Sequence, residues 1–232
     1  MRINQFLARA GFGSRRACEQ LVEQGAVMIN GEIIQVLATQ VNPGDKVKVN
    51  GCHVAVSEQT ITVAMNKPKS YVCTMDDPQE RRRIYDLLPS DFPRVVSIGR
   101  LDYDSEGLIL LTSDGDLANE LTHPSSKVPK TYEVVLDRDF DFELSPRLKK
   151  GINVEGKRAR MESIHRIGPK QLRVVLTQGI KRQIRWMFFK VGYKVKNLKR
   201  VQIGKFELGR IPLGKCKVLT PEEIQQCRSR MA

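Results

Sequence analysis

The residues best suited to chemistry lie in one short run, residues 99–107, which reads Gly-Arg-Leu-Asp-Tyr-Asp-Ser-Glu-Gly. A strand predicted at residues 94–98 leads into this run, and the apolar residues 108–112 predict a strand leading out of it. Loops between strands commonly present reactive side chains. The carboxylates of the run could bind a cation, cap turns, or act on a substrate as a nucleophile or base.

The calcium interpretation requires the spacing of an EF-hand loop. Asp102, Asp104, Glu106 and Gly107 match positions 1, 3, 5 and 6 of such a loop. Position 12 should be a bidentate Glu but is Ser113, and no helices are predicted on either side. We therefore expect no metal in this loop. The choice between turn capping and catalysis depends on the motifs that accompany the run.

The same run resembles the active-site motif of the pseudouridine synthases, through Gly-Arg-Leu-Asp, Ser-Glu-Gly-Leu and the apolar residues that follow. It is most similar to the branch that modifies uridines in ribosomal RNA. Three further stretches agree in the right order: residues 65–72 (Met-Asn-Lys-Pro-Lys-Ser-Tyr-Val), 130–134 (Lys-Thr-Tyr-Glu-Val) and 178–185 (Gln-Gly-Ile-Lys-Arg-Gln-Ile-Arg). The resemblance covers almost the whole chain and implies an isomerase that needs neither metal nor cofactor.

In the implied reaction, uridine loses its N1–C1′ bond, the uracil turns within the site, and C5 joins C1′. Such an enzyme needs a carboxylate beside the sugar or ring, donors for the detached uracil, and walls that exclude water. The resemblance makes Asp102 the carboxylate and Tyr132 the ring that stacks on the target base. It makes Arg185 the cation that keeps the carboxylate ionised in a closed pocket.

The basic residues near these motifs have two interpretations. Arg185 could contact an RNA phosphate instead of the carboxylate, and Lys181 and Arg182 are also candidates for RNA binding. We favour Arg185 over Arg182 as the partner of Asp102, because it follows Gln-Ile in the motif. Arg100 matches the residue expected to help hold the target base outside the RNA helix, where unstacking costs a few kcal/mol.

The N-terminal residues 1–50 carry a second resemblance. The stretch at residues 7–31, which contains Arg-Ala-Gly-Phe-Gly-Ser-Arg-Arg-Ala, is similar to the small S4-like RNA-binding module of a ribosomal protein. Ser14 predicts the N-cap of a helix that ends near residue 24. Arg15 and Arg16 then fall in the first turn, where free N–H groups and two guanidinium groups could hold a phosphate. The alternative is that both arginines are solvated.

The charge distribution favours a polyanionic partner. The net charge is +13, and the last 88 residues carry 23 of the 39 basic but only 5 of the 26 acidic side chains. Residues 181–217 hold 12 basic residues and one acidic residue, interleaved with aromatic rings that could stack on bases. Among those rings, we expect Phe188 and Phe189 to lie in the core.

Hydrophobic patterning predicts two domains, residues 1–60 and residues 61–232, separated by a linker near residues 57–60. Because strands outnumber helices and do not strictly alternate with them, the fold class is α+β, with a mixed, mainly antiparallel sheet in the larger domain. The predicted strands there are residues 61–66, 71–74, 94–98, 108–112, 131–136, 158–167, 171–177 and 193–203. The predicted helices are residues 84–88, 116–122, 143–150, 181–190 and 221–227.

Several classes of protein are excluded. The chain has no run of 18 apolar residues that could span a membrane and no apolar signal core at its start. Its five cysteines form no C-x-x-C pair, which indicates free thiols in the cytoplasm. We expect a monomer whose partner is ribosomal RNA, free or in a subunit or assembly intermediate, with 23S favoured over 16S. The rival interpretation is a noncatalytic RNA-binding or ribosome-assembly factor that kept the fold.

Overall fold

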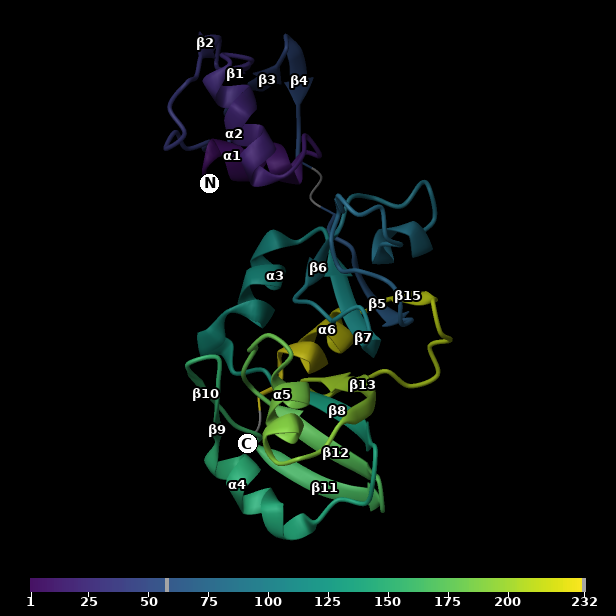
Figure 1. Cartoon of the computed structure of the whole chain (residues 1–232). Coiled ribbons are helices and arrows are strands. Elements are labelled where there is room, and N and C mark those ends of the chain that lie inside the picture. The colour runs from purple at the N-terminus through teal and green to yellow at the C-terminus, as the bar shows by residue number, and fades with distance from the viewer. Residues whose placement is uncertain (57–58, 231–232) are drawn as a thin grey trace. The chain divides into compact units, whose positions relative to one another are not determined.

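The computed structural model describes residues 1–56 and 59–230, which form two compact units, Met1–Thr60 and Ile61–Ala232 (Figure 1). Residues 57 and 58 of the predicted linker lie outside the described residues. Each unit has its own apolar core.

The unit Met1–Thr60 packs two helices on a small antiparallel sheet of strand order β2-β1-β3-β4. The Ala17 amide donates to Ser14 Oγ (3.1 Å), so the predicted N-cap of the second helix is confirmed. Cys18 and Val22 bury the inner face of that helix, whereas Leu21 is only half-buried. The elements are α1 (Ile3–Arg9), α2 (Arg15–Glu23), β1 (Val27–Ile29), β2 (Glu32–Ile33), β3 (Val47–Val49) and β4 (Cys52–Val54).

Within residues 59–230, a nine-stranded sheet forms the centre of the second unit (Figure 1). Seven strands follow the order β11-β12-β8-β13-β7-β5-β15, while β6 pairs with β7 and β14 pairs with β13. The pairing of β13 with β7 is parallel and the others described are antiparallel, which confirms the predicted mixed sheet. The strands are β5 (Thr62–Lys67), β6 (Val96–Ile98), β7 (Glu106–Thr112), β8 (Lys130–Leu136), β11 (Ser163–Gly168), β12 (Gln171–Leu176), β13 (Val195–Ile203), β14 (Phe206–Glu207) and β15 (Cys216–Val218).

Short helices pack against this sheet. Thr220 and Glu223 form the predicted capping box at the start of the last helix, and Asp114 caps α3. The helices are η1 (Ile84–Leu87), α3 (Gly115–Thr122), η2 (Pro124–Ser126), η3 (Phe142–Leu144), α4 (Ser145–Lys150), α5 (Gln183–Lys190) and α6 (Pro221–Arg228). A separate hairpin joins β9 (Ile152–Val154) to β10 (Lys157–Ala159).

The burial pattern explains why the strands that flank the 99–107 loop are apolar throughout. Every residue of β5, and all but the first of β7, is buried. One apolar cluster packs their side chains with α3 and α6, and another packs them with η1. A strand covered on both faces shows a continuous apolar run instead of alternation. The other half of the sheet buries one face against α4 and α5.

Three local predictions are wrong. Residues 71–74 are not a strand, since Val72 makes only an isolated bridge with Arg83. The strand predicted over residues 158–167 is divided between β10, which pairs with β9, and β11, which pairs with β12. The helix predicted from residue 181 begins at Gln183, because Arg182 adopts a left-handed backbone conformation with φ 51°.

Gly107 is required where β7 lies against β13. Its φ is +101°, and a Cβ at this position would lie 2.2 Å from the Arg200 carbonyl oxygen. We expect Gly107→Ala to lower the free energy of unfolding by about 3 kcal/mol, through backbone strain and separation of the two strands. Denaturant unfolding measures this change. Gly115→Ala is the matched control, because open space surrounds Gly115 at the start of α3. Equal stability of the two variants would contradict the prediction.

Candidate active site

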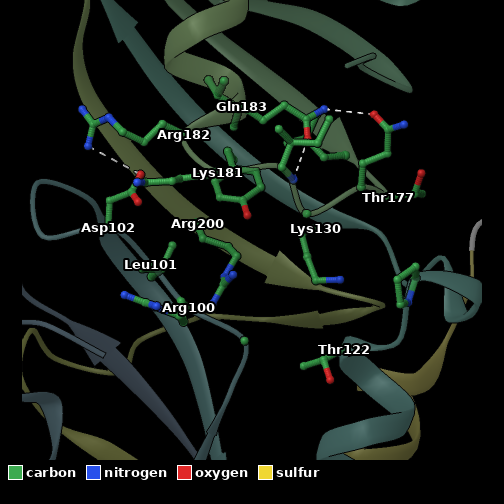
Figure 2. Close-up of a pocket in the computed structure, with 18 of the residues that line it drawn as sticks. Arg100, Leu101, Asp102, Thr122, Lys130, Thr177, Lys181, Arg182, Gln183 and Arg200 are labelled. Atoms are coloured by element: carbon green, nitrogen blue, oxygen red, sulfur yellow. Dashed lines mark hydrogen bonds and ion pairs between the residues drawn. The ribbon is translucent and has the colours of Figure 1, made fainter. Parts of the chain in front are cut away.

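A pocket of about 980 Å³ lies in the unit Ile61–Ala232 (Figure 2). Its walls come from the 99–105 loop, β8, β13, the α3–η2 connection and the turn before α5. Among the described lining residues, Asp102 is the single carboxylate. The eight lining Lys and Arg residues are Arg100, Lys127, Lys130, Lys157, Arg160, Lys181, Arg182 and Arg200. This composition suits a polyanionic ligand.

A buried lysine holds the loop that carries Asp102. Lys67, at the end of β5, is fully buried, and its Nζ donates to the carbonyl oxygens of Pro68 (3.0 Å), Asp102 (3.1 Å) and Ser105 (2.7 Å). Burial lowers the pKa of Lys67, and the nearby Cys73 and the carboxylates of the loop oppose this change. The three hydrogen bonds fix the backbone of the loop that carries Asp102.

Two arginines of the α5 segment meet the carboxylates of the same loop. Arg182 donates two hydrogen bonds of 3.0 Å to the Asp104 carboxylate and lies 3.8 Å from Asp102 Oδ2. Arg185 Nη2 donates to the Asp104 carbonyl oxygen (2.9 Å) and lies 3.2 Å from its carboxylate. Burial would raise the pKa of Asp104, but the hydrogen bonds from Arg182 and the charge of Arg185 hold it below its usual value.

This network differs from the predicted pairing of Asp102 with Arg185. Arg182, and not Arg185, makes the ion pair with Asp102, and Figure 2 shows the Arg182 side chain reaching toward it. The left-handed backbone at Arg182 ends the turn before α5 and lets its side chain reach the loop. Arg185, one turn further along, is more buried and fixes the loop through Asp104.

The floor of the pocket is one face of the sheet. Tyr132 on β8 pairs in register with Arg200 on β13, and the Arg200 guanidinium carbon lies 6.0 Å from the centre of the Tyr132 ring. Lys130 lies two residues before Tyr132 and therefore on the same face. Sequence reasoning gave Lys130 and Arg200 no role. The two-residue spacing of Lys130 and Tyr132 could have placed both side chains on one face of a strand. The position of Arg200 beside Tyr132 could not be found in this way, because it depends on the order of the strands in the sheet.

The remaining predicted residues lie in different places. Arg100 and Lys181 are exposed and line the pocket. Arg15 and Arg16 are exposed in the first turn of α2, in the other unit, as predicted. The core position predicted for Phe189 is wrong: it is 58% exposed and packs edge-to-face on Trp186, because α5 buries the opposite side, where Phe188 lies.

Within residues 1–56 and 59–230, no three His, Cys, Asp or Glu side chains are grouped so that they could hold a metal ion. No helix in the same part of the chain is both long and apolar enough to cross a membrane.

Comparison with known proteins identifies both units. Residues 61–190 match the family described as RNA pseudouridylate synthase, and residues 1–47 match the S4 domain. A crystal structure of a pseudouridylate synthase superposes with a TM-score of 0.72, at 28% sequence identity over 98% of this chain and 99% of the other. The resemblance seen in the sequence motifs is therefore confirmed.

Curated relatives match along nearly the whole chain. An uncharacterized RNA pseudouridine synthase of Aquifex aeolicus is 37% identical over 97% of this chain and 93% of its own length. The dual-specificity RNA pseudouridine synthase RluF of Escherichia coli K12 is 37% identical over 97% of this chain and 77% of its own. The ribosomal large subunit pseudouridine synthase B of Bacillus subtilis is 34% identical over 98% of this chain and 96% of its own length. The chain belongs to the RNA pseudouridine synthase family of enzymes and carries an S4 domain.

Proposed function

We propose that the chain converts a specific uridine of ribosomal RNA to pseudouridine, with Asp102 as the essential carboxylate. The observation that carries this proposal is the pocket, where the described lining residues include eight cations and a single acidic residue, Asp102. The cations attract the RNA, and the carboxylate can act on a sugar or base of the RNA that they hold. The name of the Bacillus subtilis relative, a ribosomal large subunit pseudouridine synthase, agrees with such a substrate.

The other site residues act around Asp102. Tyr132, on the pocket floor, stacks on the extruded target base. Arg185 holds the loop through Asp104, and Arg182 keeps a positive charge beside Asp102. The exposed Arg100, together with Lys181, contacts the RNA at the mouth of the pocket, where Arg100 helps to hold the base out of its helix.

The substrate that we favour is 23S ribosomal RNA over 16S, free or within a ribosomal subunit or assembly intermediate. The large-subunit relative of Bacillus subtilis, which matches along 96% of its own length, supports the preference for 23S over 16S RNA. We further propose that the protein acts as a monomer in the cytoplasm, without a metal or a cofactor.

Tritium release tests this function. C5 of the target uridine loses its hydrogen when the bond to C1′ forms, so ribosomal RNA labelled at uridine C5 should release tritium in the presence of the protein. Separate transcripts of 23S and 16S RNA, and isolated subunits, identify the substrate. Release from 16S RNA alone would overturn the preference for 23S. An absence of release from every substrate would favour the rival, a noncatalytic RNA-binding factor.

The S4 domain should contribute affinity and not chemistry. We expect Arg15→Glu and Arg16→Glu each to weaken binding of the substrate RNA by about tenfold, because each replaces a phosphate-binding cation with an anion. The single-turnover rate at saturating enzyme should stay within about twofold of the wild type. Filter binding and rapid-quench assays measure the two quantities. Lys46→Glu, an exposed lysine of the same domain, is the matched control. Equal losses of affinity in the control would remove the specific role of the two arginines.

A further inference from the structure

Two cations on the pocket floor, Lys130 and Arg200, have no acidic partner within residues 1–56 and 59–230. Lys130 and Tyr132 share one face of β8, and Arg200 on β13 pairs in register with Tyr132. All three line the pocket, and its single acidic lining residue, Asp102, has its ion pair with Arg182. Figure 2 shows the charged ends of Lys130 and Arg200 in the part of the pocket that also holds Arg100 and Thr122, away from Arg182.

Arg200 is held rigidly and retains an unused donor. Its residue is 2% exposed, and its Nε donates to the Leu108 carbonyl oxygen (2.6 Å). Its Nη2 is buried and has no acceptor among the described residues. A buried charged donor without an acceptor is costly to stability, so its persistence points to a ligand that supplies an oxygen.

Lys130 is held in a similar way. Its Nζ donates one hydrogen bond, to the Val128 carbonyl oxygen (3.0 Å), and has further N–H groups to offer. Burial, with a smaller contribution from the charge of Arg200, lowers the pKa of Lys130 to about 8. An anion placed between the two side chains would relieve this repulsion and raise the pKa of Lys130 again.

We propose that Lys130 and Arg200 bind the carbonyl oxygens of the target uracil and stabilise its negative charge after it is detached. This inference rests on the proposed function. When the N1–C1′ bond breaks, its electron pair stays on the uracil and spreads to O2 and O4. C5 then bonds to C1′, the C5 proton is lost and N1 gains a proton, so the isomerisation needs no oxidant, reductant or net proton. Fixed cations at those oxygens lower the barrier to detachment.

The depth of Arg200 favours the uracil over a phosphate as the ligand. Arg200 is nearly inaccessible to solvent and lies beside the ring of Tyr132, on which the base is proposed to stack. The phosphates of an extruded nucleotide stay nearer the RNA, where the exposed Arg100, Lys127 and Lys181 line the same pocket. A base that enters the pocket therefore reaches the buried Arg200 and the half-buried Lys130 before its own phosphates can.

The test compares Lys130→Met with Lys149→Met, which removes the same charge from an exposed position outside the pocket. Stabilisation of the detached uracil acts only in the transition state, so Lys130→Met should lower the single-turnover rate by about 10²-fold. The RNA dissociation constant should change by less than about threefold. Lys130→Arg should recover most of the rate, because it restores a permanent cation. Lys149→Met should keep the wild-type rate.

The alternatives give different results. If Lys130 binds a phosphate, Lys130→Met will weaken RNA binding and reduce its salt dependence with little change in rate, and the proposal is overturned. A wild-type rate and affinity in Lys130→Met would overturn it as well, while leaving the proposed function intact. An inactive wild type would instead refute the proposed function.

A second measurement decides the subsite without turnover. At pH 8, acetic anhydride should acetylate Lys130 readily, since a lysine with a pKa near 8 is about half uncharged there, whereas an ordinary lysine is almost fully charged. Mass spectrometry should show that uridine 5′-monophosphate protects Lys130 and that ribose 5-phosphate does not. Equal protection by the two compounds, or no protection by uridine 5′-monophosphate, would overturn the uracil assignment.

Discussion

Asp102→Asn should lower the single-turnover rate of pseudouridine formation by about 10³-fold or more, while the RNA still binds. An amide is neither the nucleophile nor the base that a carboxylate provides at this position. Binding should persist, because the eight cations of the pocket remain and the substitution removes a negative charge that repels RNA. Tritium release under single-turnover conditions and filter binding on the same RNA measure the two effects.

Asp104→Asn is the matched control, two residues away in the same loop. The Asp104 carboxylate accepts both hydrogen bonds from Arg182, so its loss should loosen the arginines without removing the reacting group. We expect this variant to keep its rate within about tenfold of the wild type. The reverse result, an active Asp102→Asn and an inactive Asp104→Asn, would transfer the catalytic role to Asp104.

Lys67→Met should be the most destabilising single substitution proposed. The three carbonyl oxygens that accept from Lys67 Nζ would lose their buried charged donor, and two of them, at Asp102 and Ser105, belong to the active-site loop. Removing such a group from a buried network costs about 3–5 kcal/mol in the free energy of unfolding. The rate should fall too, because the Asp102 backbone is no longer fixed. Urea unfolding and single-turnover assays measure both.

Lys69→Met is the control for this prediction, since it removes the same charge from an exposed position two residues further along the chain. We expect its stability to stay within about 0.5 kcal/mol of the wild type. If the two variants unfold at the same denaturant concentration, the loop does not depend on Lys67. If Lys67→Met is unstable but fully active where it is folded, Lys67 stabilises the fold without positioning Asp102.

The site was predicted from the sequence as a set of residues but not as a network. Asp102, Tyr132 and Arg182 line one pocket because β7, β8 and the α5 segment meet at the parallel pairing of β13 with β7. The ion pair between Asp102 and Arg182 depends on a left-handed residue before α5, which no periodicity in the sequence reveals. The position of Arg185 in the motif had instead suggested that arginine, one helical turn later, as the partner of Asp102.

The sequence by itself determined the family, the S4 domain and the mixed sheet, because motifs, helix caps and apolar periodicity depend on residues that are close together along the chain. Tertiary structure alone decided which charges meet. Asp104 and Arg182 are 78 positions apart, and Lys67 reaches a carbonyl 38 positions away. The order of β8, β13 and β7 likewise buries Arg200 Nη2, which has no acceptor among the described residues. Electrostatic contacts depend on distance in space, which the fold sets only after distant strands have paired.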